Sequence, residues 1–132
     1  MATIFSRILQ GEIPCYKIAE DDRFFAFLDI RPLTRGHTLV IPKTEIDYIF
    51  DLEDEQLSGM VLFAKRIAKA IHTEISCVKV GMCVIGLEVP HAHIHLVPMN
   101  QIADMNFSNA KLELDPMVME QTAAAIRARL AV

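Results

Sequence analysis

The residues with the clearest chemical potential are three histidines spaced two apart in an apolar segment. His91, His93 and His95 alternate with apolar residues between Pro90 and Pro98. Successive side chains of a β-strand point to opposite faces, so this spacing predicts that the three imidazoles share one face and the apolar residues face a core. Three imidazoles in a row predict a site for proton transfer, nucleophilic attack or metal binding.

Two interpretations of this row need no covalent chemistry. Histidines that merely decorate an exposed strand are common singly, but three in register within an apolar strand fit that interpretation poorly. A zinc site is open to a His-x-His pair that is completed by His37 or an acid. The whole row cannot easily reach one ion, because His91 and His95 would lie roughly 13 Å apart on a strand while zinc ligands lie at about 2 Å.

Covalent catalysis is the third interpretation. A neutral imidazole is a nucleophile towards phosphorus, and an ordinary histidine pKa of about 6.5 leaves much of it unprotonated at neutral pH. A hydrogen-bond acceptor for one ring nitrogen must fix the tautomer, so that the other nitrogen keeps its lone pair. Neighbouring histidines could then hold phosphate oxygens and protonate a leaving group, which accounts for three histidines in one row.

The rest of the chain predicts the elements that position the row. We expect a helix from a Thr3 cap to about Gln10, strands over 16–20, 23–29 and 37–42, a helical turn near Glu45, a long helix from an Asp51 cap to about Thr73, strands over 77–85 and 89–99, an irregular stretch over 100–114, and a last helix from Asp115-Pro116 to about Ala131. This order predicts an α+β fold with a mostly antiparallel five-stranded sheet, one long central helix and a C-terminal helix.

Composition limits the class of protein. A chain of 132 residues with 52% hydrophobic residues predicts one domain over 1–132. A net charge of −4 without a basic tract argues against a nucleic acid polymer as partner. We expect no signal peptide, no membrane span and no membrane partner, and three cysteines without a Cys-x-x-Cys pair favour free thiols in the cytoplasm.

The histidine row and several upstream blocks resemble the histidine triad (HIT) family, including its bacterial members. The segment 91–97 has the pattern His-φ-His-φ-His-φ-φ, where φ is apolar. The other similar blocks are Ile4-Phe5, Gly11-Glu12-Ile13-Pro14, Glu20-Asp21-Asp22, Ala26-Phe27-Leu28-Asp29-Ile30 and Gly36-His37-Thr38-Leu39-Val40-Ile41-Pro42-Lys43. The resemblance covers about residues 3–99 and leaves 100–132 as an extension without a motif.

This resemblance implies a hydrolase or transferase of nucleoside monophosphate esters, anhydrides or phosphoramidates that needs no metal or other cofactor. His93 would attack the α-phosphorus of a purine nucleotide or nucleoside-phosphate conjugate and carry a transient nucleotidyl group. His95 would contact the phosphate and the departing group, and His91 and His37 would orient the site. Asp29 would hold the ribose hydroxyls. Backbone amides near Val89 could contact phosphate, and the base pocket would be lined by Phe5, Ile8, Ile13, Phe27 and Ile30.

The loop before the row departs from the family pattern. Many relatives have Gly-Gln-Ser or Gly-Gln-Thr where this chain has Gly86-Leu87-Glu88. Leu87 cannot hydrogen-bond through its side chain, and Glu88 would repel phosphate if it faced inward. The substrate preference and rate are therefore open, and two alternatives stay open with them: a nucleotide-binding regulatory module with little turnover, and a metal-binding histidine row.

Two further expectations come from the family. Some bacterial relatives have a Cys-x-x-Cys zinc site where this chain has Thr3 and Ser6, which predicts no structural zinc. Family members usually form homodimers through the central helix and a sheet edge, which predicts a contact near Met60 and Val61.

Overall fold

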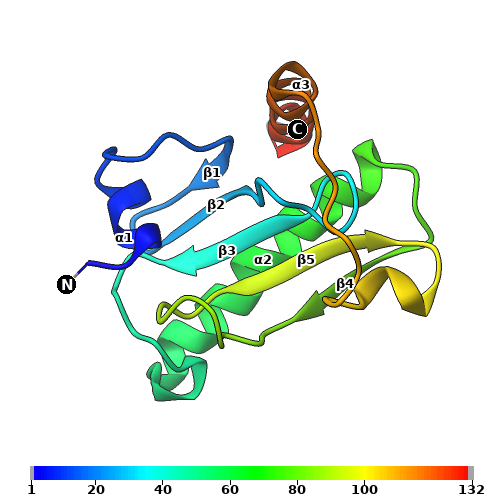
Figure 1. Cartoon of the computed structure of the whole chain (residues 1–132). Coiled ribbons are helices and arrows are strands. Elements are labelled where there is room, and N and C mark those ends of the chain that lie inside the picture. Colours follow the sequence, from blue (N-terminus) through cyan, green and yellow to red (C-terminus); the bar gives the residue numbers. More distant parts are fainter. Residues whose placement is uncertain (1, 131–132) are drawn as a thin grey trace.

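The computed structural model describes residues 2–130, which form one antiparallel sheet with helices on both of its faces (Figure 1). The strand order is β1-β2-β3-β5-β4. The strands are β1 (Lys17–Glu20), β2 (Phe24–Leu28), β3 (Thr38–Pro42), β4 (Lys79–Cys83) and β5 (Ile94–Met99). The helices are α1 (Ile4–Leu9), α2 (Asp54–Glu74) and α3 (Pro116–Leu130), with short 3-10 turns η1 (Ile49–Asp51) and η2 (Ile102–Met105). The predicted α+β class with a five-stranded sheet and a long central helix is confirmed.

Strand alternation divides the apolar side chains between two layers. Phe24 and Ala26 of β2 join the main core with residues of α2 and α3. Phe25 and Phe27 point the other way and join a smaller cluster with Phe5 of α1. Because α2 and α3 cover one face, the site can open only on the face that α1 leaves partly uncovered.

The strand that carries the histidine row begins later than predicted, at Ile94 rather than at about residue 89. Pro90 has no amide hydrogen, the His91 N–H donates to the Val89 carbonyl at 2.8 Å, and the Ala92 N–H donates to the Ile46 carbonyl at 2.7 Å. These amides are therefore bonded outside the sheet. His95 alone of the row lies in a strand, opposite Leu39 of β3 and Cys83 of β4.

The long helix also begins later than predicted. Asp51 ends the turn η1 rather than capping a helix, and α2 starts at Asp54. Ile49 and Leu52 are both buried in the main core, and the 3-10 turn between them is what buries both side chains before the helix starts. The turn expected near Glu45 lies instead at η1.

The remaining limits differ by a few residues. Strand β4 is shorter than the predicted 77–85. Helix α3 is described to Leu130, and its expected end at Ala131 lies outside the described residues. Met60, expected at a dimer contact, is fully buried in the core, whereas the neighbouring Val61 and Leu62 are 39% and 61% exposed. Within residues 2–130, no helix has the length and apolar character that a membrane span requires.

Candidate active site

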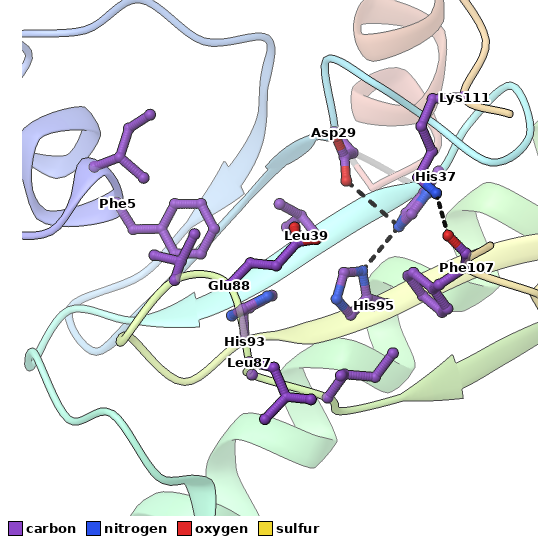
Figure 2. Close-up of a pocket in the computed structure, with 14 residues that line it drawn as sticks. Phe5, Asp29, His37, Leu39, Leu87, Glu88, His93, His95, Phe107 and Lys111 are labelled. Carbon is purple, nitrogen blue, oxygen red and sulfur yellow. Dashed lines mark hydrogen bonds and ion pairs between the residues drawn. The ribbon is translucent and has the colours of Figure 1, made fainter. Parts of the chain in front are cut away.

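A cavity of about 350 Å³ lies on the α1 side of the sheet (Figure 2). Its walls come from α1, the loop after β2, strand β3, the loop before β5, β5 itself and the segment between η2 and α3. Its lining residues are Ile4, Phe5, Asp29, His37, Leu39, Ile85, Gly86, Leu87, Glu88, Val89, His93, His95, Phe107 and Lys111.

Six of the residues predicted from the sequence line this cavity. They are Phe5, Asp29, His37, Val89, His93 and His95. The register explains this convergence, since alternation on β3 places His37 on the same face as Leu39, and Leu39 lies beside His95. Residues separated by more than fifty positions are thus brought together by sheet pairing.

The other predicted residues lie outside the cavity. Phe27 lies in the small apolar cluster behind Phe5, with ring centroids 5.6 Å apart, and Ile8 packs against the same cluster. Ile13 is half-buried, and Ile30 is 67% exposed. The prediction that these four side chains line one pocket therefore does not hold for the cavity seen here.

His91 lies beneath the cavity rather than in it. Its ring is fully buried beside Phe5, which also contacts His93, so the row does lie on the α1 side of the sheet. The prediction that all three rings project together from a strand is wrong for His91, because the chain before Ile94 is bonded outside the sheet.

Sequence reasoning missed two lining residues from the extension, Phe107 and Lys111. No motif marks the stretch between η2 and α3, so the sequence contained no signal for them. Leu39 was also missed, although its position two residues after His37 in a strand was a usable signal.

The tautomer of His93 is fixed by the backbone. Its Nδ1 lies 2.7 Å from the carbonyl oxygen of His91, which can only accept, so Nδ1 carries the proton. Nε2 therefore keeps its lone pair. Burial lowers the pKa of His93 below its ordinary value, although the bond to His91 opposes this effect. His93 is thus held as a neutral imidazole with one free nitrogen, as a nucleophile requires.

His37 and His95 form an ordered pair. The Leu33 N–H donates to Nδ1 of His37 at 3.0 Å, so the proton of His37 is on Nε2. That Nε2 lies 3.0 Å from Nδ1 of His95 and donates to it. The proton of His95 must then be on Nε2, where it is available as a donor. Burial and nearby positive charge lower the pKa of His37 to about 4 and that of His95 to about 3, so both rings are neutral at neutral pH.

A hydrogen-bond network holds His91 in place beneath this site. His91 Nε2 donates to the Pro42 carbonyl, and its Nδ1 accepts from the Thr3 hydroxyl, both at 2.9 Å. The Thr3 hydroxyl also caps α1 by accepting from the Ser6 N–H. The Glu45 carboxylate accepts from the Thr3 N–H at 2.9 Å and the Ser6 hydroxyl at 2.6 Å. Thr3 and Ser6, where relatives were expected to have zinc-binding cysteines, are thus joined by hydrogen bonds.

One group of side chains has metal-like spacing. Ligand atoms of Asp29, His37 and His95 lie within 4.8 Å of one another. A metal between the two rings would displace the proton that His37 donates to His95. That proton cannot move to Nδ1 of His37, which faces the Leu33 N–H. The donor set therefore fits a hydrogen-bonded pair and does not fit a metal ion.

Asp29 brings a carboxylate to the same end of the cavity. One oxygen accepts from the Arg31 N–H at 2.9 Å, and the other lies 3.7 Å from Nε2 of His37. Burial raises the pKa of Asp29, while the Arg31 N–H and the charge of Lys111 oppose the rise. An oxygen that is only loosely partnered can accept hydrogen bonds from a ligand's hydroxyl groups.

Comparison with known proteins gives consistent relatives. The HIT domain family model matches residues 10–102. The chain is 39% identical over 99 residues to an adenosine 5'-monophosphoramidase of Schizosaccharomyces pombe, covering 74% of each chain. It is 38% identical over 102 residues to the protein hit of Bacillus subtilis, covering 72% of this chain and 69% of that protein. A zinc-bound histidine triad family protein from Mycobacterium smegmatis has a TM-score of 0.84 at 34% identity, over 99% of this chain and 94% of that chain.

Proposed function

The chain belongs to the histidine triad family, and on this premise we propose that it is a nucleotide hydrolase or transferase that works through a nucleotidyl group on His93. The observation that carries the proposal is the 2.7 Å bond from Nδ1 of His93 to the His91 carbonyl, because it leaves Nε2 as a free nucleophile inside the cavity. The related adenosine 5'-monophosphoramidase supports a nucleoside-phosphate conjugate, such as a phosphoramidate, as the substrate class.

In the first step, Nε2 of His93 forms a bond to the α-phosphorus and the bond from phosphorus to the leaving group breaks. The leaving group takes a proton from solvent. The Nε2–H of His95 donates to a phosphoryl oxygen and stabilises the charge that develops there. In the second step, water attacks the same phosphorus, gives its proton to solvent, and releases the nucleoside monophosphate and free His93.

The rest of the cavity suits a nucleoside. Asp29 is placed to accept from ribose hydroxyls, and the Phe5 ring, 5.0 Å from that of His93, supplies an apolar wall against which a purine can pack. Backbone amides near Val89 remain available to phosphate, since its side chain lines the same cavity.

Intact-protein mass spectrometry tests the proposal. Wild-type protein, mixed briefly with adenosine 5'-phosphoramidate and quenched, is expected to carry one nucleotidyl adduct, and peptide mapping is expected to place it on His93. The variant His93→Asn is expected to carry none and to release no AMP. The matched control is His72→Asn, on the exposed surface of α2, which is expected to behave as wild type. Full turnover by His93→Asn would refute the mechanism.

A binding module with little turnover remains the second candidate. It is favoured by the loop before β5, where Leu87 is 89% exposed and Glu88 adds a negative charge to the cavity lining. Saturable binding of AMP by wild-type protein, without adduct or product from any of several nucleoside-phosphate conjugates, would select this candidate over the enzyme.

We also propose that the protein is a homodimer. Strand β4 is an edge of the sheet, and exposed apolar residues lie on it, just beyond it and on the neighbouring α2, namely Met82, Val84, Val61 and Leu62. Light scattering after gel filtration is expected to give twice the chain mass, and Leu62→Lys is expected to lower it. Ile102→Lys, at a 93% exposed position outside α2 and β4, is the control. A monomer at all concentrations would refute this proposal.

Domain organisation and location follow the same expectations. We propose a single domain over 1–132, because α3 packs on α2 and β1 as part of one core. We propose a cytoplasmic location, because Cys15, Cys77 and Cys83 are all free thiols. Limited proteolysis and fractionation of cells test these two proposals.

A further inference from the structure

The segment between η2 and α3 lies across one end of the cavity and is attached there at two points. The ring of Phe107 meets that of His95 edge to face at 4.7 Å and lies 6.0 Å from that of His37. Five residues further on, the Leu112 N–H donates to the Pro32 carbonyl at 2.9 Å, close to Asp29 in the chain. The extension is therefore part of the cavity wall.

Lys111 lies between these two attachments and contributes to the cavity lining (Figure 2). It is the one lysine or arginine among the described lining residues. Its Nζ donates to the carbonyls of Phe107 at 2.5 Å and Asn109 at 3.2 Å, both in its own segment. Among residues 2–130 it forms no salt bridge with a carboxylate. Its positive charge is thus directed to the cavity end without an anionic partner.

The charges around the cavity make this cation significant. Asp29 and Glu88 both line the cavity with carboxylates, while burial keeps His37 and His95 neutral. Lys111 is near enough that its charge helps to lower the pKa of both histidines and opposes the raised pKa of Asp29. A phosphate that entered this cavity without Lys111 would meet two negative groups and no positive one.

Resting on the proposed function, we propose that Lys111 binds the phosphate of the nucleotide, so that the extension supplies the contact that the loop before β5 lacks. Leu87 has no polar side-chain atom, and Glu88 repels an anion. A lysine has a flexible stem and three donors, so its Nζ can exchange the two carbonyls for phosphate oxygens without moving the segment. The Nε2–H of His95 lies on the neighbouring ring and donates to the same group.

Equilibrium binding of AMP and adenosine by the full-length protein tests this role. Lys111→Met is expected to weaken AMP binding by about 10- to 100-fold, the range for a charge-assisted hydrogen bond, and to leave adenosine binding unchanged. Lys111→Arg is expected to retain most of the AMP affinity, because it keeps the charge. The matched control is Lys65→Met, which removes an exposed lysine of α2 and is expected to change neither affinity.

Two results would overturn the role of Lys111 while leaving the proposed function intact. One is equal AMP affinity for wild type and Lys111→Met. The other is an equal loss of AMP and adenosine binding, which would indicate a structural effect. A wild type that binds AMP no better than adenosine would also overturn it. Failure of the proposed function itself is distinct, because it is measured by the absence of an adduct on His93.

Discussion

Lowering the pH from about 7.5 to about 5 is expected to destabilise the fold by about 4 kcal/mol through His37 and His95. A proton added to Nδ1 of His37 would face the Leu33 N–H, and one added to Nδ1 of His95 would face the Nε2–H of His37. Neither ring can therefore be protonated without losing a hydrogen bond and burying a charge.

The sign and size follow from the pKa values. Burial lowers the pKa to about 4 for His37 and about 3 for His95, whereas an unfolded histidine has a pKa of about 6.5. Between these values the unfolded chain binds more protons, so the stability that is fully present above about pH 6.5 is lost as the pH falls. One pH unit costs about 1.36 kcal/mol per group, so about 1.5 units below 6.5 cost about 2 kcal/mol for each histidine. The lowered pKa of His93 acts in the same direction.

Urea denaturation at a series of pH values measures this loss. His37→Asn and His95→Asn are each expected to reduce the pH-dependent loss by about 2 kcal/mol, whatever their effect at neutral pH. Because each protein is compared with itself, the carboxylates common to all three proteins cancel. A double variant that kept the whole wild-type pH dependence would refute the assignment of the neutral, hydrogen-bonded pair.

Three further predictions concern single groups of the site. Thr3→Val removes both the cap of α1 and the bond to His91, so a loss of about 1–2 kcal/mol in thermal unfolding is expected, with Thr3→Ser close to wild type; equal losses would exclude the hydroxyl. Because burial lowers the pKa of His93, the rate of adduct formation measured by quenched mass spectrometry is expected to change little between about pH 7.5 and about pH 6.5, and a fall that follows an ordinary histidine would contradict this. Asp29→Asn is expected to weaken AMP binding by about tenfold and to leave 2',3'-dideoxy-AMP unaffected, and an equal effect on both ligands would exclude contact with the ribose.

Much of the fold and part of the site could be predicted from local pattern. Alternation in β2 and β3 and helical spacing in α2 identify these elements, because each buries one face or stripe of apolar residues. Their limits were less predictable at Asp51 and Val89. There the chain is set by contacts with distant residues, such as the bond from Ala92 to Ile46.

By itself the sequence determined the fold class, the family and the identity of the histidine nearest to a nucleophile. These depend on residue type and spacing along the chain. Only the tertiary structure decided which ring nitrogen of His93 is free, that His91 supports the site from below, and that Lys111 reaches the cavity. The physical reason is that protonation and tautomer depend on hydrogen-bond partners and burial, and here these come from segments far apart in the sequence.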